Sequence, residues 1–238
     1  MMKTVCQMVV LATVVASFAS VQAEDAWTTL FDGKSLDGWS MAAHGKAEYS
    51  VKDGTIYGKT VEGSPNSFLK SDNEYGDFEL QFEVKVHDSL NSGCQIRSRE
   101  KTEADLDEEE KRTGKRPSGG NGIGRFHGPQ VEIEAGPGQA GYIYAEATGR
   151  GWVSEPPKDP SHSHKHMKNG EWNKFRIVAK GPRLQTWING EPVGDLTHKE
   201  LYETHPKGHI GLQVHGIAKG TGPFDVAWRN IRIKELKN

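Results

Sequence analysis

The chain contains 238 residues, with 30 lysines and arginines against 32 aspartates and glutamates, so its formal net charge at pH 7 is −2. No basic stripe is present, which argues against nucleic acid as a partner, and the length suits one β-sandwich or barrel. The 28 glycines and 11 prolines are typical of many strands joined by turns.

The N-terminal segment predicts a secretory signal peptide over residues 1–23. Lys3 supplies a positive start, residues 5–19 form an apolar run, and the small residues up to Ala23 suit a cleavage site. The run is too short to span a bilayer. We therefore expect cleavage after Ala23 and a secreted or periplasmic protein without a membrane anchor. Cys94 is then the only cysteine left, so an internal disulfide is excluded and the thiol should be buried.

Period-two alternation predicts strands along the rest of the chain. Residues 78–87 alternate apolar and polar side chains without interruption, which indicates a strand with one face on a core. Asp53-Gly54 and Asn189-Gly190 are strong signals for two-residue hairpin turns. Shorter alternating segments occupy residues 94–99, 128–136, 174–179, 183–188, 209–215 and 227–234. Helical periodicity of useful length and internal repeats are both missing, so we predict one all-β domain over residues 24–238, a two-sheet antiparallel sandwich or jelly roll.

Residues 100–122 differ from the alternating segments. They are charged, contain almost no large apolar side chains and end in a glycine-rich stretch. Residues 104–111 would suit an acidic helical turn, but the hydrophilic composition favours a mobile segment without core contacts. We therefore expect a polar insertion at about 100–122 that packs poorly on the sandwich.

The strand at residues 128–136 is the centre of the candidate site. Val131 and Ile133 point to one face, and the polar side chains between them point to the other. A solvated outer face would show the same pattern, but two other predicted strands repeat it. The expected outward set is Gln95, Arg97, Gln130, Glu132, Glu134, Gln213 and His215. We expect these side chains on one concave face.

Aromatic residues and loops are expected around this face. Tyr144, Trp152 and Trp187 would stack on sugars or hydrogen-bond to them. Loops that carry Trp39, Trp152 and residues 162–166 are expected to form its rim. The alternating histidines of residues 162–166 invite comparison with a metal site, although histidines in such loops are usually only solvated.

Several segments together resemble the 3-keto-disaccharide hydrolase family. Its opening motifs are matched by Phe31-Asp32-Gly33-Lys34-Ser35-Leu36-Asp37-Gly38-Trp39, Tyr75-Gly76-Asp77-Phe78-Glu79-Leu80 and Asn91-Ser92-Gly93. Its closing motifs are matched by Glu171-Trp172-Asn173, Asn189-Gly190, Gly211-Leu212-Gln213-Val214-His215-Gly216 and Arg229-Asn230-Ile231-Arg232-Ile233. The resemblance covers residues 27–236 and implies a concanavalin A-like fold of the lectin and glucanase type. The insertion and the central strand look like a subgroup variant.

The resemblance implies cleavage of 3-keto-glycosides. A ketone at C3 acidifies the hydrogen at C2, a base removes it, the aglycone leaves C1, and water then adds. The route needs a base, a group that stabilises the enolate and an acid near the leaving oxygen. We expect His215 as the base, Glu132 as acid or metal ligand, and Arg97 as the clamp on enolate or substrate. Pairing with Arg97 would keep Glu132 ionised.

The carbohydrate or glycoside substrate would be held by further outward residues. The expected substrate-binding residues are Gln95, Gln130, Glu134, Gln213, Trp187, Trp152 and Tyr144. The pattern identifies no definite cofactor, but a divalent cation would suit the clustered carboxylates and histidine, with Glu132 and His215 as its candidate ligands.

Two other functions fit the same pattern. A non-catalytic carbohydrate-binding module would use the same polar row and aromatic residues, because the fold alone does not imply catalysis. A laminarinase-type glycoside hydrolase would need two carboxyl groups about 5–5.5 Å apart. That second family continues its acid series where this chain has Gly136. The sequence leaves open the sugar, the aglycone, the metal and the oligomeric state.

Overall fold

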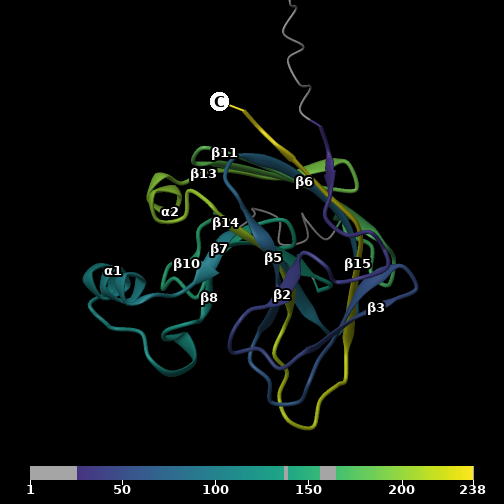
Figure 1. Cartoon of the computed structure of the whole chain (residues 1–238), viewed down its shortest axis with the longest axis horizontal. Coiled ribbons are helices and arrows are strands. Elements are labelled where there is room, and N and C mark those ends of the chain that lie inside the picture. The colour runs from purple at the N-terminus through teal and green to yellow at the C-terminus, as the bar shows by residue number, and fades with distance from the viewer. Residues whose placement is uncertain (1–25, 137–138, 156–164, 238) are drawn as a thin grey trace, which may run out of the picture.

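Strand β6 (Phe78–Val86) shows why this chain forms a sandwich. Its apolar side chains at alternate positions are all buried, and the polar side chains between them lie on the outer face. A strand with one apolar face must cover that face with a second layer. The computed structural model, which describes residues 26–136, 139–155 and 165–237, supplies that layer as a second antiparallel sheet (Figure 1).

The first sheet, sheet A, has eight strands within the described residues. In spatial order it contains β13 (Glu191–Thr197), β12 (Arg183–Ile188), β11 (Asn173–Lys180), β6, β15 (Asp225–Glu235), β4 (Thr55–Lys59) and β3 (Glu48–Lys52), and β1 (Thr28–Thr29) pairs with β15. The predicted hairpins at Asp53-Gly54 and Asn189-Gly190 are confirmed, since they join β3 to β4 and β12 to β13. All four turn residues have positive φ, as this kind of turn requires.

The second sheet, sheet B, has seven strands within the described residues. In spatial order it contains β10 (Gly151–Trp152), β9 (Ile143–Glu146), β8 (Phe126–Glu134), β7 (Asn91–Glu100), β14 (Gly208–Val214), β5 (Ser67–Tyr75) and β2 (Trp39–Met41). The apolar faces of the two sheets form one core, which includes Cys94, Val131 and Ile133. Cys94 is therefore buried, as expected.

The expectation of a poorly packed insertion is wrong. Helix α1 (Glu103–Thr113) fills half of residues 100–122, and the 3₁₀ turn η1 (Gly119–Asn121) follows it. Asp105 starts α1 by accepting a hydrogen bond from the backbone N–H of Thr102, and the helix ends at Gly114, which has a φ of 75°. The helix lies beside β8 and β10 (Figure 1). Its side chains attach to the sandwich mainly through ion pairs, which is why hydrophobic periodicity does not reveal the packing.

One of those ion pairs is buried. Lys101 Nζ lies 2.7 Å from Glu109 Oε2, and both side chains have little exposure. Beside it, the backbone of Thr148 accepts a hydrogen bond from Arg112, which holds α1 to the turn after β9. A second short helix, α2 (Lys199–Thr204), lies between β13 and β14 in the chain. No helix among the described residues is long and apolar enough to cross a membrane.

Two aromatic residues expected around the site lie elsewhere. Trp39 belongs to the core, where its indole N–H donates to the carbonyl of Leu30, so it forms no part of a rim. Trp187 lies on the outer face of sheet A, where the Arg176 guanidinium stacks 4.1 Å from its ring centroid. An aromatic residue type alone does not place a side chain at a site, because the sequence does not tell which sheet carries a given strand.

Candidate functional site

The register of three strands of sheet B builds the site. Gln130 lies opposite Gln95, and Glu132 lies opposite Gly93, where β8 pairs with β7. Strand β14 pairs with the other edge of β7, and its C-terminal end lies on the same face of sheet B as Gln130 and Glu132. A cavity of about 310 Å³ results, lined by Asn66, Asn91, Gln130, Glu132, Tyr144, Glu146, Gln213 and His215. We call this cavity the sheet B site.

Glu132 is the most buried carboxylate of the sheet B site, with only 5% of its surface exposed. Asn91 Nδ2 donates to its Oε1, and Gln130 Nε2 donates to its Oε2 at 3.1 Å. Gln213 Nε2 donates in turn to Gln130 Oε1 at 3.1 Å. A chain of amides therefore fixes the orientation of both carboxylate oxygens.

Burial raises the pKa of Glu132 to about 7. The amide hydrogen bonds from Asn91 and Gln130 oppose the rise in pKa, and the negative charges of Glu134 and Glu146 add to it. The expectation that Glu132 stays permanently ionised is therefore wrong. A carboxyl group with this pKa can both give and take a proton near neutral pH.

Arg97 does not lie in the sheet B site. Its guanidinium donates to the carbonyls of Gly76 and Gly181 and forms an ion pair with Asp77 at 2.8 Å. The register of β7 shifts between Gln95 and Arg99 relative to β8, and Arg97 has a φ of 50°. This β-bulge interrupts the alternation and turns the side chain away from Glu132.

Gly128 on β8 is the sequence signal that could have revealed the bulge. A Cβ atom there would lie 2.4 Å from Ser98 Oγ, so only glycine allows the two backbones to approach this closely. The strand expected to begin at Gly128 begins at Phe126, so Gly128-Pro129 lies inside β8. Glycine and proline inside a strand indicate a bulge.

His215 lines the same cavity as Glu132. Its Nδ1 lies 2.8 Å from the carbonyl oxygen of Gly216, which can only accept a hydrogen bond. The proton of the neutral imidazole is therefore on Nδ1, and Nε2 carries the lone pair. This tautomer is the one that a base acting through Nε2 needs.

A second carboxylate, which sequence reasoning missed, lies in the sheet B site. Glu146 is buried and accepts hydrogen bonds from Arg125 and, at 3.3 Å, from Asn66 Nδ2. Extending the alternation from Tyr144 by one step would have found Glu146. Arg125 and Asn66 come from outside the predicted strands, so alternation gives no signal for them.

The remaining predicted residues divide into two groups. Tyr144 lines the cavity, and its ring meets that of Trp152 edge-on at 5.2 Å, with Trp152 40% exposed at the rim. Glu134 shares the strand face but accepts from the backbone N–H of Gln139 outside the cavity lining. Gln95 is fully buried beside Gly211 and likewise does not line the cavity.

The donor set of the sheet B site does not form a ready metal centre. Both oxygens of Glu132 already accept amide protons, and Glu146 accepts from Arg125. Across the part of the chain that the structure describes, no group of three or more His, Cys, Asp and Glu side chains is arranged to hold a metal ion. The histidines at 162 and 164 lie outside the described residues.

A cavity larger than the sheet B site lies on sheet A. It has a volume of about 560 Å³ and includes Tyr57, Trp172, Asp225 and Arg229 in its lining. Tyr57 donates to Asp225 at 2.9 Å, and the Arg229 guanidinium covers the ring of Trp172 at 4.1 Å. These groups satisfy one another, so size alone does not identify the reactive site.

Comparison with known proteins places this arrangement in a family. Residues 26–234 match the family of the 3-keto-alpha-glucoside-1,2-lyase-like domain. A 3-keto-disaccharide hydrolase from Bacteroides thetaiotaomicron is 24% identical over 252 residues, which cover 89% of this chain and 79% of that protein.

Solved structures show the same fold at low identity. A proposed glycosyl hydrolase from Parabacteroides distasonis superposes with a TM-score of 0.56 at 19% identity, over 90% of this chain and 95% of that chain. A β-glucanase from Bacillus licheniformis gives a TM-score of 0.55 at 11% identity, over 89% of this chain and 98% of that chain. The fold is thus the jelly-roll sandwich of lectins and glucanases, as the alternation and the motifs predicted.

Proposed function

Because this chain belongs to the family of the 3-keto-alpha-glucoside-1,2-lyase-like domain, we propose that it cleaves 3-keto-glycosides between C1 and the aglycone oxygen. It is a carbohydrate-active protein of the 3-keto-disaccharide hydrolase type. The observation that carries the finer proposal is the sheet B site, where a carboxyl group with a pKa of about 7 shares one cavity with an imidazole base.

In the first half of the reaction, His215 Nε2 takes the proton from C2 of the sugar. The electron pair of the C2–H bond forms the C1=C2 double bond, and the bond from C1 to the aglycone oxygen breaks. Glu132 in its protonated form gives its proton to the departing oxygen, so the aglycone leaves as a neutral alcohol. Raised pKa values are typical of carboxyl groups that act as acids.

In the second half, water adds across the C1=C2 bond. Glu132, now a carboxylate, takes a proton from the water while the oxygen attacks C1, and the imidazolium of His215 returns a proton to C2. Both residues regain their starting states, and the net change is hydrolysis. The cationic clamp expected from Arg97 is replaced by Tyr144, whose pKa is raised by burial and by the nearby Glu146 and Glu132, so that its hydroxyl remains a donor.

The decisive experiment measures turnover of a chromogenic 3-keto-α-glucoside deuterated at C2. A primary isotope effect on kcat/KM is expected, because C2–H cleavage belongs to the chemical step. The same glucoside without the C3 ketone should not be cleaved. Absence of the isotope effect, with the glucoside cleaved, would instead favour the laminarinase type, and binding without turnover would favour a carbohydrate-binding module.

His215→Ala tests the base. We expect turnover to fall by roughly 10²–10⁴, the usual contribution of a general base. His209→Ala is the matched control, because His209 lies on β14, which leads directly to His215, and hydrogen-bonds to the carbonyl of Ser71 away from the cavity. Near-normal turnover of His215→Ala would move the role of base to Glu132.

We also propose export of the protein through the signal peptide at residues 1–23. The apolar run and the small residues before Glu24 support this, and the segment lies outside the described residues. Mass spectrometry of the protein from a periplasmic fraction should find Glu24 as the first residue. Retention of Lys3 in that material would contradict the proposal.

A further inference from the structure

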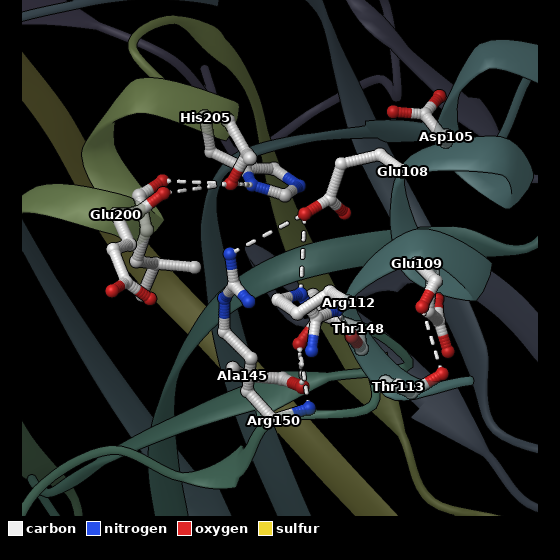
Figure 2. A network of polar contacts seen from close by, with 12 residues as sticks. Asp105, Glu108, Glu109, Arg112, Thr113, Ala145, Thr148, Arg150, Glu200 and His205 are labelled. Carbon is white, nitrogen blue, oxygen red and sulfur yellow. Dashed lines mark hydrogen bonds and ion pairs between the residues drawn. The ribbon is translucent and has the colours of Figure 1, made fainter. Parts of the chain in front are cut away.

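A further cavity, lined by many charged side chains, lies at the opposite end of β7 and β8 from the sheet B site. It has a volume of about 280 Å³, and the two cavities share no lining residue. We call it the helix cavity, because α1 and α2 both contribute to its walls. Its lining includes Arg99, Asp105, Glu108, His127, Arg150 and His205. Figure 2 shows Glu108 and Arg150 meeting beside His205.

Two buried imidazoles are the first unusual feature of the helix cavity. His127 and His205 are each 3% exposed, and their rings meet edge-on with centroids 4.8 Å apart. Among the residues that the structure describes, neither ring has a hydrogen-bond partner for its buried Nε2 atom. His127 Nε2 lies 3.7 Å from Asp105 Oδ2, which is beyond hydrogen-bond distance.

The hydrogen bonds of Thr204 define the tautomer of His205. Thr204 Oγ1 lies 3.1 Å from the carbonyl of Leu201 and 3.2 Å from that of Glu200, so its proton goes to a backbone carbonyl. At 2.9 Å it therefore accepts the Nδ1 proton of His205. His205 Nε2 is then a buried lone pair that lacks a donor, and burial keeps the ring neutral by lowering its pKa to about 2. Such an atom needs a donor from outside the chain.

The charges around the cavity are balanced. Arg99 pairs with Asp105 at 2.5 Å, and Glu108 lies 3.1 Å from Arg112 Nε and 3.7 Å from Arg150. Glu109 pairs with Lys101, and Glu203 completes the lining carboxylates. Three arginines and four carboxylates line the cavity, and Lys101, which pairs with Glu109 from outside the lining, brings the cations to four, so no net field favours an anion. The walls nevertheless offer many directed donors and acceptors.

We propose that the helix cavity binds one neutral polyhydroxylated molecule of monosaccharide size, with a ligand hydroxyl donating to His205 Nε2. The volume of about 280 Å³ lies just below the usual range for small-molecule sites, which suits a ligand of monosaccharide size. Hydroxyl groups both donate and accept, so they match neutral imidazoles, carboxylates and guanidiniums at once. A free sugar carries such hydroxyl groups, and a carbohydrate-active protein encounters free sugars. The proposal concerns binding alone and does not depend on the activity of the sheet B site.

The test titrates the full protein, labelled with ¹⁵N at histidine, with glucose, methyl glucoside, glucuronate and inorganic phosphate. A donor to the lone pair of His205 Nε2 changes the nitrogen resonance of that atom. We expect a saturable change with the neutral sugars and at least about tenfold weaker binding of glucuronate and phosphate. No saturable change with either neutral sugar would mean that ordered water alone fills the cavity, and the proposal would be wrong.

Variants separate the helix cavity from the sheet B site. Glu132→Gln should leave the change at His205 intact, and loss of the change in this variant would assign the ligand to the sheet B site and overturn the proposal. His205→Phe removes the lone pair and should weaken glucose binding at least about tenfold, detected by calorimetry. Unweakened binding in a folded His205→Phe protein would also overturn it.

Glu108→Ala tests the proposal independently, in case the His205→Phe protein folds poorly. The Glu108 side chain is 42% exposed, so its loss should be tolerated by the fold. It leaves Arg112 and Arg150 without their shared carboxylate, and preference should shift from glucose towards glucuronate. Arg116 follows α1 and pairs with exposed carboxylates of that helix, so Arg116→Met is the matched control and should bind as the unaltered protein does. An unchanged preference in Glu108→Ala would contradict the role of charge balance.

Discussion

Glu132 is a nearly buried carboxyl group whose hydrogen-bond partners are amides and not cations. Burial favours its protonated form, and the amides favour its ionised form. The result is a group with a pKa of about 7 rather than one fixed in either state. Arg97 could have removed this property by pairing with it, and the bulge of β7 prevents that.

The charge of Glu134 should tune the acid. Its negative charge raises the pKa of Glu132, although its side chain lies outside the cavity lining. Because Glu132 must be protonated to act as acid, activity should fall as pH rises through the pKa of this group. We expect Glu134→Gln to move that fall to lower pH with little change in KM, as measured by kcat/KM against pH.

Two comparisons make the result interpretable. Glu48→Gln, an equal charge change on an exposed strand of sheet A, should leave the profile unchanged. A higher KM in Glu134→Gln would instead assign Glu134 the substrate contact that the alternation first suggested. An unmoved profile would mean that Glu132 is not the titrating acid.

At the scale of elements, β7 depends on a residue without a side chain. A Cβ atom at Gly93 would lie 2.4 Å from Gln130 Cδ, the amide that links Glu132 to Gln213. Gly93→Ala should therefore displace Gln130 and lower kcat/KM by about tenfold or more while the sandwich still folds. Gly120→Ala, where a Cβ would meet nothing within 4 Å, is the control and should behave as the unaltered protein. Full activity of Gly93→Ala would show that the amide chain is not needed.

Helix α1 should depend on its buried ion pair. Lys101→Met leaves the carboxylate of Glu109 buried without a partner, which typically costs about 3–5 kcal/mol. We expect a large loss in the free energy of unfolding measured by urea denaturation. The double variant Lys101→Met with Glu109→Leu should recover most of it, because no charge then remains buried. Arg116→Met, which removes only exposed ion pairs, should change little.

The same two elements show what the sequence can and cannot predict. Alternation predicted the strands and the joint location of Gln130, Glu132, Gln213 and His215, because each apolar partner had to reach the core. The alternation did not predict the position of Arg97, because a β-bulge adds one residue to the strand and the apolar–polar pattern of the sequence does not show it. It also failed for α1, because a helix that packs through ion pairs has no apolar stripe.

For the whole molecule, Glu132 carries a cost in stability. Its pKa in the folded protein exceeds the ordinary value of 4.5, so the folded state binds more protons than the unfolded state between pH 4.5 and about 7. Stability must therefore decrease as pH rises through this window. Glu132→Gln removes this dependence. The side-chain amides of Gln130 and Gln213 can turn over and still pair with each other and with the new amide, because Gln213 Oε1 has no hydrogen-bond partner within the described part of the chain.

Denaturation at several pH values checks this prediction. At pH 8 the Glu132→Gln protein should be more stable than the unaltered protein by up to about 3 kcal/mol, since each pKa unit is worth about 1.4 kcal/mol. At pH 4 the advantage should vanish, because Glu132 is then protonated in both states. An equal difference at both pH values would show that packing, and not titration, causes it.

The bulge of β7 also divides the strand into two parts that can diverge separately. Asn91, before the bulge, lines the sheet B site, whereas Arg99 beyond it faces α1 and α2. Insertions of any length after Glu100 therefore leave the alternation of Asn91, Gly93 and Gln95 unchanged. Proteins that share this strand can therefore differ in the segment after the bulge while they keep the site residues before it.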